Sequence, residues 1–348
     1  MAFNAEQISY SGKASMDYII RQSPTDIYNI DRPLLKALRS TAKEFPGAKQ
    51  FITEKLRTTN DSNFQWFGPD GEVTYNRKRT LSEANFAWGS AHDGFALTEE
   101  ELLQNYITVT DDKDSTPTTS EKHQFVNLIT ENTETLKLGF AEKFDYELHL
   151  DGTQNAESVP GLDLLISTTP AVGTVGGIDR SVTAAWRNYA SLGIAATPGV
   201  LNSELEKGWR SMTRVGGNSP NLILAGSKFI DAYRAEQAAT QQRHIVMGSG
   251  GVSVADGSIN DLTFKGIPIM WDPVMDDLQA NLAPATPWDK RAYFLNTRFL
   301  HLRPAKGQDM VTRNPPRVYN RYTHYWGLTW RGAMTITRPA SMGVFSVA

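Results

Sequence analysis

The feature that most limits how this chain can fold is a long β-hairpin predicted over residues 51–93. Residues 64–67 and 72–75 are rich in aromatic and β-branched side chains, and residues 68–71 between them are turn formers. The returning strand is expected to continue to Trp88. An isolated hairpin of this length is only marginally stable in water, so it needs a surface on which to lie.

This hairpin carries the residues that we single out as a contact site. Trp66 precedes the predicted turn, and Arg77, Lys78 and Arg79 lie on the returning strand. Exposed aromatic side chains on such an arm indicate a partner surface or, less often, carbohydrate. Three consecutive cations could touch nucleic acid, but midway along a hairpin they fit better with acidic groups of an adjacent subunit. We predict that these four residues make inter-subunit contacts.

A long helix is predicted from about residue 120 to residue 146. Its apolar residues recur at helical spacing and form one stripe, and most of its charged residues lie off that stripe. The stripe consists of Phe125, Leu128, Ile129, Leu136, Phe140 and Phe144. At about 1.5 Å per residue such a helix is roughly 40 Å long, which exceeds the average for globular proteins. Gly139 weakens it locally. A rod of this length suits a structural spine, although an ordinary domain can also contain one.

The N-terminal residues 1–30 are polar, irregular and contain scattered aromatic residues. They fit either a frayed terminus or an arm that becomes ordered on a neighbouring subunit. A helix follows, with Asp31 as its expected cap, Pro33 in its first turn and Pro46-Gly47 as its end.

The region from about residue 161 to residue 287 has α/β character. We expect a helix with Leu201, Leu205, Trp209 and Met212 on its apolar side, and a second helix capped by Ser227. Strands are expected at 221–225 and 263–271, and the chain becomes β-rich after Pro287. The β-rich part consists of one strand at 293–302 and a very long one at 317–337, broken or bent at Gly327 and Gly332.

Composition excludes several classes of protein. The chain has 348 residues, is 40% hydrophobic and contains no cysteine, which rules out a disordered chain, a disulfide scaffold and thiolate chemistry. Its length suggests two domains, or one with long excursions. The net charge of −3 argues against a dedicated nucleic-acid binder. No apolar run is long enough to span a membrane.

The charges are unevenly distributed along the chain. Residues 94–160 hold 14 acidic and 4 basic residues, whereas residues 290–348 hold 10 basic residues and one acidic residue. Such blocks are usually solvated faces, and the sharper interpretation is that opposite-sign surfaces steer identical subunits together.

The sequence lacks local catalytic or cofactor motifs. The glycine-rich segments at 173–177 and 248–251 do not have dinucleotide-binding spacing. The six histidines form no i, i+4 pair that could face a metal, so each is interpreted as an ordinary polar or packing residue. Asp111, Asp112 and Asp114 do not fit a calcium loop. We therefore expect no cofactor, no metal and no enzyme activity, although a Ser/His/Asp set could still assemble from distant positions.

Several short strings occur in a specific order. They are residues 93–95 with 101–103, residues 173–180 with 186–188, residues 264–269 with 271–272, and residues 293–297. The most specific of them contains Gly176, Gly177, Ile178, Asp179 and Arg180, followed by Trp186, Arg187 and Asn188. From about residue 50 onward, the chain resembles the major capsid proteins of tailed bacteriophages, which have the Hong Kong 97 capsid fold.

This resemblance implies an α+β fold of four parts. Residues 1–50 correspond to an N-terminal arm and residues 51–105 to an extended E-loop hairpin. Residues 106–159 and 288–348 correspond to a peripheral domain with a spine helix, and residues 160–287 to an α/β axial domain. The family's covalent crosslink between lysine and asparagine cannot be located here by motif.

The resemblance also implies a function. Subunits of this family form pentamers and hexamers that close into an icosahedral shell around double-stranded DNA, which they contact non-specifically, without a cofactor or a membrane. Portal and scaffolding or decoration proteins are expected partners, and scaffolding is expected from a separate protein unless a leader was removed. The expected location is the virion, after assembly in the host bacterial cytoplasm.

Two other interpretations remain open from the sequence. One keeps the fold but makes the chain an encapsulin-like compartment with protein cargo, which an adjacent cargo gene would favour over terminase and portal genes. The other is a glycan-binding or hydrolytic α/β protein that uses the scattered tryptophans. A solitary monomer with measurable sugar affinity would favour that second interpretation.

Overall fold

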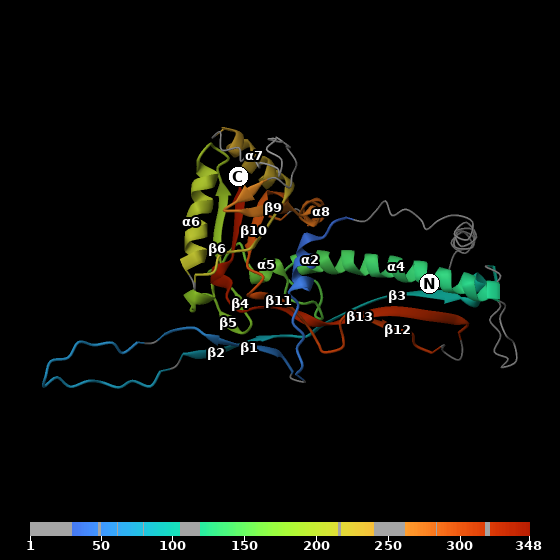
Figure 1. Ribbon diagram of the computed structural model, residues 1–348, viewed down its shortest axis with the longest axis horizontal. Coiled ribbons are helices and arrows are strands. Elements are labelled where there is room, and N and C mark those ends of the chain that lie inside the picture. The colour runs from blue at the N-terminus through green and yellow to red at the C-terminus, as the bar shows by residue number, and fades with distance from the viewer. Residues whose placement is uncertain are drawn as a thin grey trace, which may run out of the picture. The chain divides into compact units, whose positions relative to one another are not determined.

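The computed structural model describes most of the chain (Figure 1). The described residues are 30–47, 50–60, 62–78, 80–104, 119–214, 217–239, 262–282, 284–316 and 321–348, without the side chains of 119–127. The irregular N-terminal residues 1–29 and the segment that contains Asp111, Asp112 and Asp114 lie outside them. None of the helices described has the length and apolar character needed to cross a membrane.

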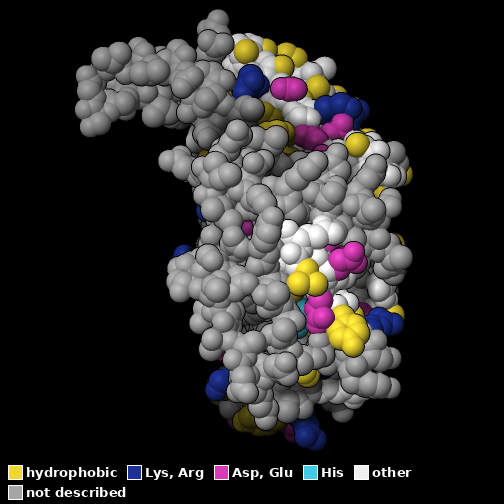
Figure 2. Space-filling model, turned by 90° about the vertical axis from the view of Figure 1, so that its right-hand side faces the viewer, with side chains coloured by type: hydrophobic (Ala, Val, Ile, Leu, Met, Phe, Trp, Pro, Cys, Tyr) yellow, Lys and Arg dark blue, Asp and Glu magenta, His cyan; other side chains and the backbone are white. Residues whose placement is uncertain are grey.

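The chain forms two compact units. Unit 1 comprises Met1–Ile30, Ser90–Phe144 and Gly307–Arg331, and unit 2 comprises Asp31–Gly89, Asp145–Lys306 and Gly332–Ala348. Figure 2 shows Lys/Arg and Asp/Glu side chains on one and the same face, so the described part of that face does not carry a single sign of charge.

Unit 2 is built on a six-stranded mixed sheet with the order β6-β14-β10-β7-β9-β8. Its strands are β6 (Tyr189–Ile194), β14 (Gly343–Val347), β10 (Arg291–Leu295), β7 (Leu222–Ala225), β9 (Ile267–Trp271) and β8 (Thr263–Phe264). β10 is antiparallel to both of its neighbours, and Tyr293 lies opposite Leu224 on one side and Val344 on the other. Every residue of β10 and β14 is buried, as expected for central strands.

Two helices, α6 (Val200–Arg214) and α7 (Ser227–Ala239), pack against this sheet. Their apolar residues form one cluster with alternate strand residues such as Ala292, Phe294 and Phe345. The predicted apolar side of α6 is confirmed, because Leu201, Leu205 and Met212 are buried. A third helix, α8 (Pro273–Leu282), follows β9 directly. Short elements complete this part of the unit: α5 (Leu162–Leu165), η1 (Ala184–Trp186), η3 (Trp288–Lys290) and η4 (Pro339–Ser341).

A second sheet is centred on the long strand β13 (Thr323–Ile336), which confirms the strand predicted there. β11 (Leu300–Pro304) pairs with its C-terminal end in unit 2. In unit 1, β12 (Val311–Arg313) pairs with Gly327–Thr329, and β3 (Gly89–Thr98) also pairs with β13. β13 runs on as one strand through Gly327 and Gly332, so the predicted break is not observed.

The predicted long helix is confirmed as α4 (Thr119–His149). In unit 1 its buried stripe includes Leu136, Phe140 and Phe144, and the ring of Phe144 packs against Trp330 with 4.6 Å between centroids. A short helix that was not predicted, α3 (Glu99–Gln104), begins with a capping box. The Thr98 amide donates to Glu101 Oε2 at 2.8 Å, and the Glu101 amide donates to Thr98 Oγ1 at 3.3 Å.

Several predicted boundaries are wrong for local reasons. The segment 263–271 is not one strand, because Lys265 and Gly266 both have positive φ and reverse the chain between β8 and β9. The segment 293–302 is two strands in different sheets, β10 and β11. Between them Asn296 turns the chain, since its carbonyl accepts from the Phe299 and Leu300 amides. The strands β10 and β14, which follow residue 288, lie in the same sheet as β7 and β9.

Two predicted helix caps are also corrected. α2 (Pro33–Ser40) begins after Arg32 and has no side-chain cap among the described residues, and the Asp31 carboxylate accepts from the Arg32 amide. The helix ends at Ser40, well before Pro46. The N-terminus of α7 is capped from α8, because the amide and the hydroxyl of Ser227 both donate to Asp276.

Two glycines provide a test of this packing. A Cβ on Gly161 would lie 2.0 Å from the Leu150 carbonyl oxygen, whereas a Cβ on Gly139 in α4 would meet nothing within 4 Å. We expect Gly161→Ala to lower the free energy of unfolding by at least about 2 kcal/mol. Gly139→Ala should raise it by about 0.5–1 kcal/mol through helix propensity. Urea unfolding of dissociated subunits measures both, and equal effects would contradict the packing at Gly161.

Candidate inter-subunit surface

The base of the predicted hairpin packs against the rest of unit 2. β1 (Ile52–Arg57) and β2 (Leu81–Phe86) pair antiparallel, with Ile52 opposite Phe86. Ala84 and Phe86 are buried, and the Asn85 amide donates to the Gly176 carbonyl at 2.9 Å. A Cβ on Gly176 would lie 3.0 Å from the Cβ of Ala84, so the close approach favours glycine. The returning strand ends at Phe86, and β3 beyond it pairs with β13, so the predicted hairpin is shorter than expected.

The string around residues 173–188 supports this attachment. Its first part forms the two-stranded hairpin of β4 (Thr174–Val175) and β5 (Ile178–Asp179). The buried Trp186 donates from Nε1 to the Val175 carbonyl at 3.0 Å, and the buried Arg180 donates to the Leu165 carbonyl. Asn188 donates to the Ser167 carbonyl at 2.9 Å. These residues therefore fix the β4–β5 hairpin, against which the base of the predicted hairpin packs.

Beyond its base the hairpin has little regular structure. Residues 58–80 form no strand where they are described, although the Thr58 amide donates to the Thr80 carbonyl at 3.1 Å. The predicted turn is confirmed by a bond from the Gly71 amide to the Gly68 carbonyl at 2.9 Å. Figure 1 shows the two segments running side by side away from the sheet of unit 2 (blue). In this part of the chain the expected long strands are reduced to a short paired base.

The distal hairpin exposes large apolar side chains. Trp66 and Tyr75 are each 91% exposed. Phe64 and Phe67 are also exposed, and the Phe64 ring packs edge-on against Trp66 at 5.3 Å. Soluble proteins rarely leave four large aromatic side chains of one short hairpin in water, and such exposed apolar surface marks interaction sites. We call Phe64, Trp66, Phe67 and Tyr75 the aromatic tip.

The predicted contact residues lie on this part of the hairpin. Trp66 belongs to the aromatic tip, Arg77 and Lys78 are exposed, and Arg79 lies outside the described residues. Neither Arg77 nor Lys78 forms an ion pair within the described part of the chain, so both charges are available to a partner. Their contact with an acidic neighbour stays a prediction.

Charge reversal tests that prediction. Replacing Arg77, Lys78 and Arg79 together by glutamate should impair assembly while leaving the subunit folded. Each exposed pair contributes at most about 1 kcal/mol, but the contact recurs in every subunit and its effect is multiplied. Electron microscopy scores assembly and circular dichroism scores folding; normal particles from the triple variant would refute the contact. Replacement by glutamine is the matched control and should give a smaller loss.

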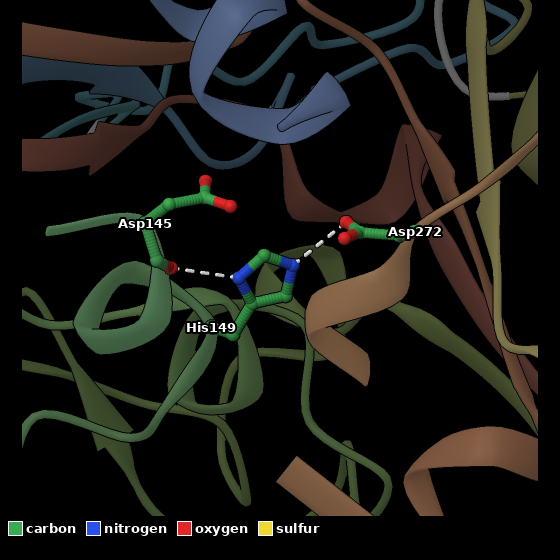
Figure 3. A group of neighbouring side chains, drawn as sticks. All are labelled: Asp145, His149 and Asp272. Carbon is green, nitrogen blue, oxygen red and sulfur yellow. Dashed lines mark hydrogen bonds and ion pairs between the residues drawn. The ribbon is translucent and has the colours of Figure 1, made fainter. Parts of the chain in front are cut away.

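A buried polar cluster lies elsewhere in unit 2, where three helix ends meet (Figure 3). His149 closes α4, and its Nε2 lies 2.9 Å from Asp272 Oδ2. Asp272 precedes α8, and its Oδ1 accepts from the Val274 amide at 3.2 Å. Asp145 Oδ1 accepts from the Leu35 amide in the first turn of α2 at 3.1 Å. Each carboxylate thus faces a helix N-terminus and the imidazole faces a C-terminus, which matches the helix dipoles.

The three groups of this cluster perturb each other strongly. Burial disfavours the imidazolium, but the charge of Asp272 and its hydrogen bond overcome this and raise the pKa of His149 to about 9. Burial raises the pKa of Asp145 to about 6. All three side chains are completely buried. The cluster therefore ties the ends of α2, α4 and α8 through charges that water does not screen.

Sequence reasoning missed this cluster because it compared histidines only with one another and did not look for a histidine and a carboxylate on the same helix face. The spacing of Asp145 and His149, four residues apart on one helix, was a usable signal. Asp272 followed by Pro273 is the sequence pattern of a helix start. Nothing in the sequence indicates that these two segments meet, because His149 and Asp272 are 123 residues apart.

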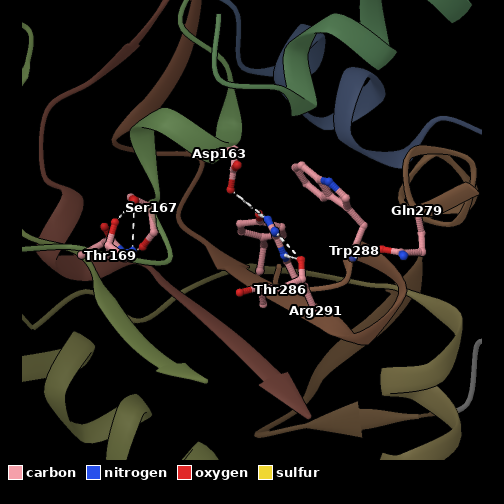
Figure 4. A network of polar contacts seen from close by, with 9 residues as sticks. Asp163, Ser167, Thr169, Gln279, Thr286, Trp288 and Arg291 are labelled. Carbon is pink, nitrogen blue, oxygen red and sulfur yellow. Dashed lines mark hydrogen bonds and ion pairs between the residues drawn. The ribbon is translucent and has the colours of Figure 1, made fainter. Parts of the chain in front are cut away.

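A second polar network fixes the start of β10 (Figure 4). The buried Arg291 donates to Asp163 Oδ1 at 2.8 Å and to the Thr286 carbonyl, and its guanidinium lies 4.2 Å from the Trp288 ring centroid. Burial raises the pKa of Asp163, against the effect of Arg291. All of these partners hold Arg291 in place, so we assign the network to structure.

A second buried histidine allows a pH prediction. His301 Nε2 lies 3.3 Å from Lys43 Nζ, and burial together with the charges of Lys43 and Arg303 lowers its pKa from 6.5 to about 4. The folded state therefore keeps His301 neutral while the unfolded chain binds a proton, so stability falls as pH drops from 6.5 to 4. Between pH 6.5 and 4, we expect the free energy of unfolding of His301→Gln to fall by about 1–2 kcal/mol less than that of the unmodified chain. Urea unfolding across this pH range measures it, and an unchanged slope would contradict the assignment.

The comparisons with known proteins identify the fold. No protein-family model matches the chain, and no curated protein matches it. Solved structures do match: the cyanophage A-1(L) capsid asymmetric unit has 14% sequence identity and a TM-score of 0.63, covering 94% of this chain and 95% of that one. The capsid of Myoviridae phage XM1 has 13% identity and a TM-score of 0.54, covering 100% and 99%. The capsid of a native GTA particle has 12% identity and a TM-score of 0.52, covering 94% and 95%.

These likenesses extend over almost the whole of each chain. The chain therefore has the α+β fold of bacteriophage capsid proteins, and the resemblance predicted from the short sequence strings is confirmed at the level of the fold. At these sequence identities the comparison establishes the fold. The function has to be inferred from the exposed surface of the subunit.

Proposed function

We propose that this chain is the major capsid protein of a tailed double-stranded DNA bacteriophage. Its copies form pentamers and hexamers that close into an icosahedral shell around the genome. The fold it shares with phage capsid proteins supports this proposal. The single observation that carries it is the aromatic tip, a set of large apolar side chains that the subunit itself leaves in water.

The partner that fits the hairpin best is a second copy of the chain. The aromatic tip supplies apolar area, and Arg77 and Lys78 supply positive charge close to it. The acidic block at 94–160 offers the complementary sign on another copy. Because every subunit carries both halves of the contact, the same interaction can repeat around a closed shell.

The parts of the chain then take the roles that the resemblance implies. Residues 1–50 act as the N-terminal arm, residues 51–105 as the E-loop, and α4 as the spine of the peripheral domain. The six-stranded sheet with α6 and α7 is the axial domain, and it includes β10 and β14 from the C-terminal part of the chain. The expected partners are a portal protein, scaffolding or decoration proteins, and packaged DNA bound non-specifically. The protein acts structurally, without catalysis, in a virion assembled in the bacterial cytoplasm.

The distribution of the tryptophans favours this function over the glycan-binding alternative. Trp186, Trp288 and Trp330 are buried, as core anchors are, and do not line a shared platform. The exposed Trp66 lies on the hairpin, where a protein partner is expected.

Expression of the chain, alone and with a candidate scaffolding protein, tests the proposal. Negative-stain electron microscopy should show closed particles tens of nanometres across. A chain that stays monomeric at all concentrations and binds a sugar would overturn the proposal in favour of the glycan-binding alternative. Particles that carry a host enzyme as cargo in place of DNA would identify an encapsulin-like compartment.

A further inference from the structure

We propose that Asp145, His149 and Asp272 bind one divalent transition-metal cation, and that Zn²⁺ is the ion whose ligand preferences fit them best. The site lies inside unit 2, and it is independent of the hairpin surface and of the proposed capsid function. Two of its three ligand atoms come from the C-terminal end of α4, and the third comes from Asp272 between β9 and α8, so a bound ion would link two segments that are far apart in the sequence.

The first argument is an unsatisfied carboxylate oxygen. Asp145 is completely buried, and its Oδ1 accepts from the Leu35 amide. Its Oδ2 has no hydrogen-bond partner within the described part of the chain. Figure 3 shows this carboxylate turned toward the side on which Asp272 lies. A buried carboxylate oxygen without a partner is costly, and a cation in the cluster would satisfy it.

The second argument is the orientation of the imidazole. The Asp145 carbonyl accepts a hydrogen bond from His149 Nδ1 at 2.8 Å. This bond fixes the ring and directs Nε2 toward Asp272 Oδ2. Histidines that ligate metals commonly donate their other nitrogen to a carbonyl or carboxylate in this way, because the bond fixes the tautomer and raises the basicity of the ligating nitrogen.

The third argument is distance. The three candidate ligand atoms lie within 4.8 Å of one another. Around a tetrahedral zinc ion with bonds of about 2.0 Å, ligand atoms are about 3.3 Å apart. Small side-chain movements would therefore bring the three atoms to their bonding positions. A further carboxylate oxygen or a water would complete the coordination.

The fourth argument is charge. A dication with two carboxylates and a neutral imidazole has no net charge, which suits a site with no exposure to solvent. Without the ion, the same groups leave one excess negative charge when the imidazole is protonated. Ca²⁺ and Mg²⁺ fit less well, because both ions require about six oxygen ligands and this cluster supplies a nitrogen and two carboxylates.

Metal analysis of the full chain, purified without a histidine tag, tests the proposal. After dialysis against metal-free buffer, mass spectrometry should find about one zinc per chain. Chelation should lower the melting temperature, and Zn²⁺ should restore it. Protein stripped of zinc and given Co²⁺ should show the visible absorption of a tetrahedral site.

Variants assign the ion to these residues. Asp145→Asn retains an oxygen that can accept from the Leu35 amide but removes the charge, and it should weaken Co²⁺ and Zn²⁺ binding at least about 100-fold. Asp163→Asn and His301→Gln are the matched controls and should keep full metal content. Substoichiometric zinc in the wild-type chain, with no Co²⁺ spectrum and no Zn²⁺-dependent melting shift, would overturn the proposal and leave a metal-free ion pair. Unchanged binding by Asp145→Asn would overturn it equally. If that variant does not fold, the wild-type measurements decide alone.

Discussion

Replacing Trp66 with serine should abolish or strongly reduce shell assembly while the subunit itself stays folded. Trp66 is 91% exposed in the isolated chain, so its loss removes little intramolecular packing beyond the edge-on contact with the Phe64 ring. Buried against a neighbouring copy, a tryptophan at the centre of an interface contributes at least about 2 kcal/mol. That corresponds to roughly a 30-fold weaker contact per subunit, and a closed shell needs all of these contacts together.

The measurement is the yield of particles by sedimentation and electron microscopy, with circular dichroism of the soluble subunit as the test of folding. Trp66→Phe is the matched control, because it retains an aromatic side chain at the same place and should recover a substantial part of the yield. Wild-type yields from the serine variant would contradict the assignment of the aromatic tip to an interface.

His149→Leu should destabilise the subunit more than any substitution on the hairpin. The change leaves Asp272 and Asp145 buried without the cation that faces them, and breaking a buried ion pair costs about 3–5 kcal/mol. Urea unfolding at neutral pH measures the change in the free energy of unfolding.

The matched control for this substitution is His301→Leu. His301 is also buried, but its lowered pKa of about 4 keeps it neutral at neutral pH, and its Nε2 faces Lys43. Its replacement should therefore cost less than about 2 kcal/mol. Equal losses in the free energy of unfolding from the two variants would contradict the conclusion that charged groups of the cluster hold the helix ends together.

Sequence reasoning succeeded where one local signal was strong. The long helix α4, the long strand β13 and the turn at Gly68–Gly71 were each visible within a short window, and all three are present. It failed where a single residue decides the path of the chain. The positive φ of Lys265 divides one predicted strand into two, and the turn at Asn296 sends the next two strands into different sheets.

The candidate sites divide in the same way. Trp66, Arg77 and Lys78 were predicted because exposure on a hairpin is a local property. The cluster of Asp145, His149 and Asp272 depends on the meeting of three helix ends, and no local pattern specifies that meeting. In the sequence, the string at 173–188 indicated only a resemblance to a family. The structure gives it a physical role, because it forms the surface against which the base of the hairpin packs.

An electron-microscopy map of the assembled particle tests the central claim most directly. The account predicts that the segment 58–80 of each subunit lies on a neighbouring copy and that Trp66 is covered there. A map in which Trp66 remains in solvent, or preparations in which the chain stays solitary with its hairpin folded onto its own body, would contradict it.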